Sequence, residues 1–428
     1  MSDRQVAGGG SLQGEVRVPG DKSVSHRALI FGALAEGTTE ALGLAPGADV
    51  RSTRGVLQDL GVEILGEGTD LVVKGRGLGG FKPPTKSLDA GNSGTTMRLM
   101  TGALAGHPFS SRLIGDESLS RRPMERVAAP LRALGASVLL SEKGTAPVTV
   151  LGGRLRGAEV SLAVASAQVK SAALLAGLHA SGTTTVIEPA PTRDHTEKML
   201  GLFGAPPRRD GLRTTVTGGA RLSGTTVEAP GDPSSAAFWA VAAALAPGSE
   251  LKVSGVMANP TRVGFLEVLR RMGADVRREK SRPRAGEECE DLIVRGSRLK
   301  GTTVEAAEIP GLVDEVPILA LAAAVAEGES RFRGLDELRH KESDRLAGIA
   351  ELLTRFGARV RVEGDDLIVA GGAKLTGAKA DSLGDHRLAM TGFVAGFLAA
   401  GETTVLDADC AVISYPSFYA DFLARRRG

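Results

Sequence analysis

A repeated α/β pattern constrains the fold of this 428-residue chain more than any other feature. Six segments rich in alanine and leucine end at a turn of glycine or other small residues, and a Thr/Val-rich, strand-like segment usually follows. Successive turns lie about 65 to 80 residues apart, a period typical of repeated supersecondary units. The six segments are 27–35, 97–105, 169–180, 236–246, 316–326 and 387–399.

A second motif alternates with the first and reads Leu-x-x-Leu/Met/Phe-Gly-Ala/Val. Glycine just past a helix adopts the left-handed conformation that ends it, so each copy predicts a helix C-terminus. Each repeat therefore reads strand–helix–strand–helix–strand–strand. The copies lie at 57–62, 131–136, 200–205, 269–274 and 352–358, with a truncated one at 418–423.

The first helix of each repeat is apolar on all sides, which predicts that it is buried with sheets around it. Three such repeats make one α/β domain, so six predict two similar domains. The Gly/Pro-rich segment Ala229–Pro233 lies near the midpoint of the chain and is the expected crossover between them. An unrelated string of α/β elements in a glycine-rich chain is the alternative.

Composition excludes several classes of protein. A net charge of +2 and 4% aromatic residues do not fit a nucleic-acid binder. No apolar run approaches the length of a membrane span, and the N-terminus lacks the pattern of a signal peptide. Cys289 and Cys410 lie far apart, and the histidines form no zinc motif. We therefore expect a cytoplasmic protein with no metal.

Polar residues gather before each apolar helix. Lys22, Ser23 and Arg27 precede the first one, where free backbone N–H groups already favour an anion. Solvated basic residues on a capped surface helix are the alternative. Because similar residues recur in both halves, we expect the helix starts to converge on a cleft for a polyanionic ligand. The other starts are 89–98, 166–171, 231–235, 313–315 and 384–387.

Two further basic clusters have the same character. Arg122 directly precedes Pro123 and is a better candidate for gripping an anion than its neighbour Arg121. On a helix, Lys341 and Arg345 would share a face, which is unfavourable unless an anion lies between them. A salt-bridged exposed helix is the alternative there. Together with Asp314 and Glu342, these cations suit acid/base chemistry on a multiply anionic small molecule.

These segments resemble the 3-phosphoshikimate 1-carboxyvinyltransferase (EPSP synthase) family. The matching motifs run in family order over nearly the whole chain. They are Pro19-Gly20-Asp21-Lys22-Ser23-x-Ser25-His26-Arg27, Gly91–Thr95, Arg121–Met124, Ser166–Lys170, Thr192–Glu197, Gly231–Ser235, Val313–Glu315, Lys341–Arg345 and Asp385–Arg387.

The resemblance implies the enolpyruvyl transferase fold, an inside-out α/β barrel of two similar domains, each with three βαβαββ repeats. Its first residues return to the C-terminal domain, so one domain is expected over 18–230 and the other over 1–17 plus 231–428. The implied reaction joins the 5-hydroxyl of shikimate 3-phosphate to phosphoenolpyruvate and releases phosphate. It needs no metal or organic cofactor. Domain closure on binding is expected, since the proposed site draws residues from both halves.

The resemblance also implies the role of each site residue. Asp314 is similar to the base at the 5-hydroxyl, Glu342 to the acid that protonates the methylene, and Lys22 is the third residue placed in catalysis. The contacts expected for shikimate 3-phosphate are Lys22, Ser23, Arg27, Ser166, Ala167, Gln168, Arg193, Asp314 and Lys341. Those expected for phosphoenolpyruvate are Lys22, Gly94, Arg122, Gln168, Arg345 and Arg387.

Some positions depart from part of the family. Many members carry a lysine where Ile413 precedes Ser414-Tyr415-Pro416, and Ala167 is serine elsewhere. Members that tolerate the herbicide glyphosate often have alanine where this chain has Gly94. We therefore expect glyphosate to compete with phosphoenolpyruvate here.

Two other functions compete with this one. The UDP-N-acetylglucosamine enolpyruvyl transferases share the repeats but use a reactive cysteine in a mobile loop, whereas Cys289 lies among carboxylates that would leave it unreactive. A non-catalytic anion-binding protein would need neither Asp314 nor Glu342. The expected partners are the two small-molecule substrates, without nucleic acid or membrane, and the expected state is a monomer.

Overall fold

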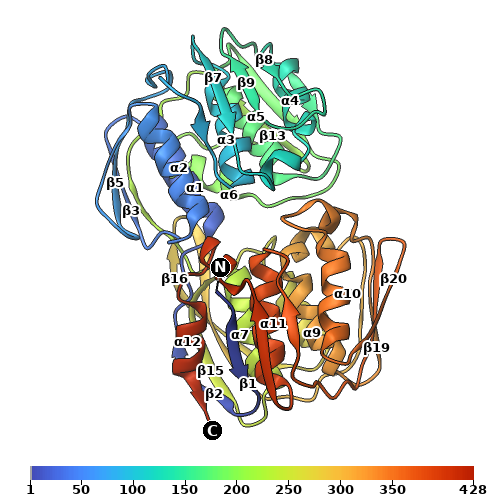
Figure 1. The fold of residues 1–428 in the computed structure, drawn as a ribbon. Helices are drawn as coiled ribbons and strands as arrows, with labels where there is room; N and C mark the ends of the chain where they lie inside the picture. Colours follow the sequence, from blue (N-terminus) through green and yellow to red (C-terminus); the bar gives the residue numbers. More distant parts are fainter. Residues whose placement is uncertain (1) are drawn as a thin grey trace. The chain divides into compact units, whose positions relative to one another are not determined.

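The computed structural model describes residues 2–428 and divides the chain into two compact units. Unit 1 contains the chain up to Pro19, then Pro230–Pro283 and Glu287–Gly428, and unit 2 contains Gly20–Ala229 with Arg284–Gly286 (Figure 1). No helix within residues 2–428 has both the length and the hydrophobicity needed to cross a membrane.

Unit 2 repeats one pairing scheme in its sheets. In each sheet, the first strand pairs in parallel with the strand that follows a buried helix. This second strand then pairs antiparallel with the last strand of a β-hairpin. The sheets are β14(Thr226–Glu228)-β3(Thr38–Leu42)-β5(Leu71–Lys74)-β4(Glu63–Leu65), β6(Leu88–Asp89)-β7(Ser110–Ile114)-β9(Val148–Leu151)-β8(Ser137–Leu139) and β10(Glu159–Ser161)-β11(Thr183–Ile187)-β13(Arg213–Thr217)-β12(Arg208–Asp210).

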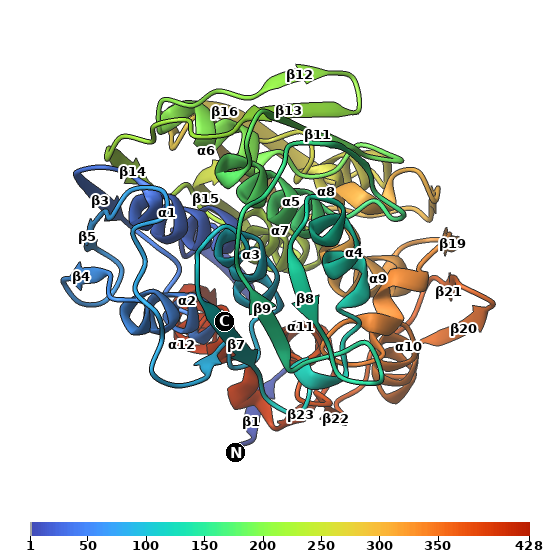
Figure 2. The same cartoon turned by 90° about the horizontal axis from the view of Figure 1, so that it is seen from above.

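The apolar helices of unit 2 lie inside this ring of strands, as Figure 2 shows for α1, α3 and α5. They are buried along almost their whole length, because no side of them is polar enough to face water. The helices are α1 (Lys22–Leu34), α3 (Gly94–Leu104) and α5 (Ala167–His179), with the more amphipathic α2 (Ala48–Asp59), α4 (Glu125–Ala133) and α6 (His195–Leu202), and the 3-10 turn η1 (Leu119–Arg121).

Gly102 allows α3 to pack tightly against α5. A Cβ atom at this position would lie 2.2 Å from the carbonyl oxygen of Ala172, far inside van der Waals contact. The backbones of the two helices approach so closely only because glycine has no side chain.

Unit 1 follows the same scheme. Its sheets are β16(Asp275–Arg284)-β17(Glu287–Arg295)-β15(Glu250–Met257)-β2(Ser11–Val16)-β24(Arg426–Arg427), β18(Thr303–Val304)-β19(Glu329–Phe332)-β21(Asp366–Ala370)-β20(Arg359–Glu363) and β1(Arg4–Ala7)-β23(Glu402–Leu406)-β22(Lys379–Asp381). The amphipathic helices are α8 (Gly264–Arg271), α10 (Arg345–Arg355) and α12 (Phe418–Arg425), and the 3-10 turns are η2 (Ile309–Gly311), η3 (Val313–Glu315), η4 (Asp336–His340) and η5 (Ala408–Ile413).

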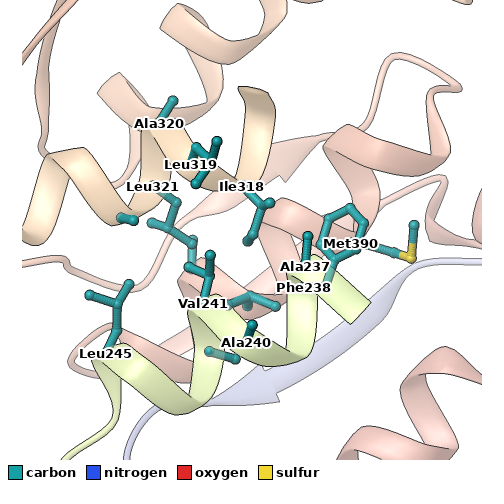
Figure 3. Close-up of a cluster of buried hydrophobic side chains, with 14 of the residues drawn as sticks. Ala237, Phe238, Ala240, Val241, Leu245, Ile318, Leu319, Ala320, Leu321 and Met390 are labelled. Carbon is teal, nitrogen blue, oxygen red and sulfur yellow. The ribbon is translucent and has the colours of Figure 1, made fainter. Parts of the chain in front are cut away.

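The core of unit 1 forms where α7 (Pro233–Leu245), α9 (Val316–Val325) and α11 (His386–Leu398) meet. All residues of α7 are buried. Figure 3 shows Phe238 and Val241 of α7 facing Ile318 and Leu321 of α9, with Met390 of α11 beside them. Burial of each such side chain contributes about 1.5–3 kcal/mol, which explains why three apolar helices share one interior.

Two strands lie next to the points where the chain passes between the units. Strand β2 precedes α1 in sequence, yet it pairs in parallel with β15 of unit 1. Strand β14 precedes α7, yet it pairs in parallel with β3 of unit 2. The first sheet of unit 1 is therefore completed by a strand from the N-terminal segment of the chain, and that of unit 2 by a strand from the end of its own segment.

The fold class expected from the sequence is confirmed, with buried helices in all six predicted positions. One local prediction is wrong. Lys341 and Arg345 do not share a helix, because η4 ends at His340, Lys341 is extended and α10 begins only at Arg345.

Candidate active site

The predicted site residues fall into two groups, one in each unit. Those of unit 2 lie at the starts of α1, α3 and α5, just before α4, and just before α6. They are Lys22, Ser23, Arg27, Gly94, Arg122, Ser166, Ala167, Gln168 and Arg193. Those of unit 1 lie at η3 and at the starts of α10 and α11. They are Asp314, Lys341, Glu342, Arg345 and Arg387.

The first turn of α1 presents Lys22 beside a carboxylate. Asp21 caps the helix by accepting the backbone N–H of Val24 at 2.8 Å. Lys22 Nζ lies 3.0 Å from Asp49 Oδ2 of α2, and its side chain keeps 22% of its exposure. Lys22 is therefore held in place while part of it stays accessible. The sequence did not predict a contact between Asp49 and Lys22, because only the packing of α2 against α1 places the two side chains together.

Arg27 is held by hydroxyl groups from α5 and α6. Its Nε donates to Thr196 Oγ1 and its Nη2 to Ser171 Oγ, both at 2.7 Å. Its Nη1 donates to the carbonyl oxygen of Ser23 at 2.9 Å. These contacts fix a buried guanidinium next to the first turn of α1.

Three predicted residues converge around the start of α3. A Cβ atom at Gly94 would lie 2.8 Å from Arg98 Nη1 and 3.3 Å from Arg122 Nη1, so two guanidinium groups face this glycine. Arg98 Nη1 donates to Gln168 Oε1 at 2.6 Å. Arg122 Nη2 donates to Asn92 Oδ1 at 2.9 Å. With the free N–H groups of the helix start, this arrangement suits a small anion.

The neighbouring Arg121 behaves as expected for a surface residue, since it is exposed and pairs with Glu117 one turn away. Arg98 is a site residue that the sequence reasoning did not single out. Its position within the first turn after the Gly-rich segment was the available signal.

The start of α5 presents the remaining predicted contacts of unit 2. Ser166 is the N-cap residue, and Ala167 and Gln168 form the first turn. Gln168 Nε2 donates to Thr95 Oγ1 at 2.8 Å, so its amide is anchored between Thr95 and Arg98. Arg193 lies half-buried just before α6.

In unit 1, three cations surround the Asp314 carboxylate. Arg345 Nη1 lies 3.2 Å from Asp314 Oδ1, and Lys341 Nζ and Arg387 Nε each lie 3.9 Å from it. Arg387 Nη1 also donates to the carbonyl oxygen of Asp314 at 2.9 Å. An isolated carboxylate at this position would be costly, and these cations stabilise it in its charged form.

Arg345 is the centre of this cluster. It is 1% exposed, and its Nε and Nη2 donate to Asp385 Oδ2 at 2.7 Å and to Glu342 Oε2 at 2.5 Å. Burial alone would lower the pKa of Arg345, but the carboxylates of Asp385, Glu342 and Asp314 outweigh it and raise the pKa. Arg345 thus stays charged at any pH at which the protein folds.

Asp385 links the same cluster to α11. Its Oδ1 caps the helix by accepting the N–H of Arg387 at 2.9 Å, while its Oδ2 accepts from Arg345 and from Ser343 Oγ. Burial opposes ionisation of Asp385, but the adjacent Arg345 outweighs this effect and holds its pKa below the ordinary value. The sequence pointed to the motif containing Asp385 but gave it no role.

Lys341 and Arg387 of unit 1 have properties that suit contact with a ligand. Burial lowers the pKa of Lys341, and Asp314 opposes this effect. Arg387 is buried, and within residues 2–428 its Nε has no hydrogen-bond partner. A buried guanidinium N–H without a partner is costly, so a ligand oxygen could satisfy it. Ile413, a position at which the sequence departs from the expected lysine, ends η5.

The chain is similar to known proteins over nearly its whole length. A family model described as EPSP synthase (3-phosphoshikimate 1-carboxyvinyltransferase) matches residues 6–422. Among curated relatives, the 3-phosphoshikimate 1-carboxyvinyltransferases of Gloeobacter violaceus and of Synechococcus sp. strain WH7803 are 51% and 52% identical to the chain. The alignments cover 97% of both chains for the first, and 99% of this chain and 98% of the relative for the second.

A solved structure is similar over the same length. An EPSP synthase from Acinetobacter baumannii, determined at 2.37 Å, is 42% identical and superposes with a TM-score of 0.89. The match covers 99% of this chain and 98% of that one.

Proposed function

Because the chain belongs to the EPSP synthase family, we propose that it transfers the enolpyruvyl group of phosphoenolpyruvate to the 5-hydroxyl of shikimate 3-phosphate. The products are 5-enolpyruvylshikimate 3-phosphate and phosphate, a step of aromatic amino acid biosynthesis. The observation that best supports this reaction is the Asp314 carboxylate among Lys341, Arg345 and Arg387. It combines a proton acceptor with fixed cations for anionic substrates.

The residues of unit 2 are proposed to bind mainly shikimate 3-phosphate. Lys22, Ser23 and Arg27 offer an ammonium, a hydroxyl and a guanidinium at the start of α1. The start of α5 adds donors from Ser166, Ala167 and Gln168, and the loop before α6 adds Arg193. Helix N-termini with added cations are well suited to a phosphate and a carboxylate. In unit 1, Asp314 and Lys341 are proposed to contact the same substrate.

Phosphoenolpyruvate is proposed to bind N–H donors of both units. Gly94, Arg122, Lys22 and Gln168 of unit 2 and Arg345 and Arg387 of unit 1 are the expected contacts. Two guanidinium groups face Gly94, and the Nε of Arg387 has no hydrogen-bond partner within residues 2–428; both observations support this assignment. Glyphosate, which also carries a phosphonate and a carboxylate, is proposed to compete for these donors.

The proton transfers follow from the chemistry of the transfer. Asp314 takes the proton of the 5-hydroxyl as its oxygen bonds to C2 of phosphoenolpyruvate, and Glu342 gives a proton to the methylene carbon. In the resulting tetrahedral intermediate the C–O bond to phosphate breaks and the bonding electrons leave with the phosphate. The methyl carbon then returns a proton to the Glu342 carboxylate, which restores the double bond, and the proton held by Asp314 leaves with the phosphate. Lys22 and the arginines stabilise the charge that develops on the departing phosphate.

Several expectations stay predictions. We propose that units 1 and 2 are the two catalytic domains, that no metal or cofactor takes part, and that the protein is a cytoplasmic monomer without nucleic-acid or membrane partners. The free cysteines Cys289 and Cys410 fit a reducing compartment. Cys289 lies in strand β17 and is 1% exposed, which argues against the reactive loop cysteine of the UDP-N-acetylglucosamine transferases.

Phosphate release from phosphoenolpyruvate tests this function directly. The assay compares shikimate 3-phosphate with UDP-N-acetylglucosamine as acceptor, in buffer with EDTA. Release only with shikimate 3-phosphate is the expected result. Release only with the nucleotide sugar would overturn the proposed acceptor, and release with neither by a folded, anion-binding protein would favour a binding function.

A further inference from the structure

We infer that Lys170, Glu188 and Glu197 form a buried ion cluster that positions the shikimate 3-phosphate contacts of unit 2. None of the three residues is proposed to touch a substrate, so Lys170 is a positioning residue. The inference rests on the proposed function, because it concerns the affinity for one of its two substrates.

The cluster is compact and shielded from water. Lys170 Nζ lies 2.9 Å from Glu188 Oε2 and 2.7 Å from Glu197 Oε1. The three side chains are 0%, 1% and 7% exposed, in the same order. Thr192 Oγ1 donates to the second oxygen of Glu188. Because buried charges are costly without their partners, removal of the single cation would leave two carboxylates to repel each other.

Its members come from α5 and from near the two ends of the loop that holds Arg193. Lys170 lies on α5, one turn beyond Ser166, Glu188 directly follows β11, and Glu197 lies in the first turn of α6. The two carboxylates therefore stand near both ends of the loop that holds Arg193. Through Lys170, this loop is tied to the helix start that presents Ser166, Ala167 and Gln168.

A second connection lies next to the first one. Ser171, which follows Lys170, hydrogen-bonds to Thr196, which precedes Glu197, with 2.6 Å between their hydroxyl oxygens. Arg27 donates to both hydroxyl groups at 2.7 Å. A shift of α6 relative to α5 would thus displace the partners of Arg27 as well as Arg193.

Two of the expected phosphoenolpyruvate contacts of unit 2, Gly94 and Arg122, lie at α3 and just before α4, outside the elements that the cluster connects. Arg122 is held by Asn92, and Gly94 faces Arg98 and Arg122 at the start of α3. Loss of the cluster should therefore weaken the binding of shikimate 3-phosphate more than the binding of phosphoenolpyruvate. Such a difference would distinguish a positioning role from general destabilisation of the protein.

The test begins with wild-type protein that turns over shikimate 3-phosphate, which establishes the proposed function independently. In Lys170→Met we expect the KM for shikimate 3-phosphate to rise about tenfold or more and the KM for phosphoenolpyruvate to change less than about threefold. Calorimetric titration of shikimate 3-phosphate alone should show the same loss of affinity. Lys86→Met is the matched control, since Lys86 pairs with Asp59 at the surface of the same unit.

A second variant keeps the inference testable if Lys170→Met does not fold. Glu197→Gln retains an oxygen acceptor for Lys170 and leaves the cluster with one carboxylate for one cation. We expect a smaller rise in the KM for shikimate 3-phosphate, about threefold, again without a matching change for phosphoenolpyruvate. Equal changes in both KM values, or no change in either folded variant, would overturn the inference while leaving the proposed function intact.

Discussion

At the scale of single residues, the site of unit 1 is held together by ion pairs between buried or partly buried side chains. Asp314, Glu342 and Asp385 all contact Arg345, which is almost completely buried. Removal of one partner would leave a buried charge uncompensated, whereas an isosteric amide keeps most of the hydrogen bonds. Isosteric variants therefore separate the catalytic role of these residues from their role in stability.

Glu342→Gln tests the proposed acid. The amide keeps an oxygen that can accept from Arg345 Nη2, so substrate binding should persist, but it has no proton of suitable acidity for the methylene carbon. We expect kcat to fall by about two orders of magnitude or more, with both KM values little changed. Steady-state kinetics measures this effect, and Glu351→Gln, on the exposed face of α10, is the control. Wild-type turnover in Glu342→Gln would remove this residue from its role.

Gly94→Ala tests the phosphoenolpyruvate contacts. The added methyl group would press on Arg98 Nη1 and Arg122 Nη1, at 2.8 and 3.3 Å from the Cβ position. We expect the KM for phosphoenolpyruvate to rise about tenfold and inhibition by glyphosate to weaken. Gly153→Ala, where a Cβ meets nothing within 4 Å, is the control. A wild-type protein unaffected by millimolar glyphosate at limiting phosphoenolpyruvate would contradict the proposed competition.

At the scale of the elements, the packing of α3 against α5 is set by Gly102. In Gly102→Ala the Cβ would lie 2.2 Å from the Ala172 carbonyl oxygen, so the helices must separate. We expect a loss of about 1–3 kcal/mol in the free energy of unfolding of unit 2. Gly55→Ala on α2, where a Cβ meets nothing within 4 Å, should leave stability unchanged or raise it by about 0.4–1 kcal/mol. Urea unfolding measures both, and equal effects would contradict this view of the α3–α5 contact.

The C-terminal ends of these two helices contain a pair of histidines. His107 and His179 have ring centroids 4.9 Å apart. Burial lowers the pKa of His107 from 6.5 to about 4, and burial together with His107 lowers that of His179 to about 3. The folded state therefore binds fewer protons than the unfolded state below pH 6.5, so stability is present above that pH and is lost as the pH falls.

This pair predicts acid lability of unit 2. Between pH 7.5 and pH 5, each histidine should cost about 2 kcal/mol of the free energy of unfolding. Thermal unfolding at the two pH values measures the loss, which should be smaller in His179→Leu than in the wild type. His340→Gln, at an exposed position, is the control and should behave like the wild type. An unchanged pH dependence in His179→Leu would show that this pair does not titrate as described.

At the scale of the whole molecule, unit 1 combines the N-terminal segment with the second half of the chain. Strand β2 completes a sheet of unit 1 before the chain enters unit 2, and β14 completes a sheet of unit 2 before the chain returns. We expect a monomer in solution, so light scattering after size-exclusion chromatography should give a mass near 44.1 kDa. A mass of about twice that value, independent of concentration, would contradict this expectation.

The sequence alone determined the positions of the buried helices and the residues at their starts. A helix such as Val316–Val325 has no polar side, so only burial suits it, and glycine marks its end. Local capping chemistry likewise placed Lys22, Gln168 and Arg387 at helix starts. These features depend on neighbours a few residues apart, and such short-range patterns can be read directly from the chain.

The tertiary structure alone decided which distant residues meet. Asp49 reaches Lys22, and Asp314 receives Arg345 and Arg387, because helices far apart in sequence pack side by side. The same packing breaks the expected helix between Lys341 and Arg345, since Arg345 begins α10 with its side chain buried among carboxylates. The pairing of β2 with β15, more than 230 residues later in the chain, also has no local signal. These contacts depend on packing over the whole chain, which no local pattern encodes.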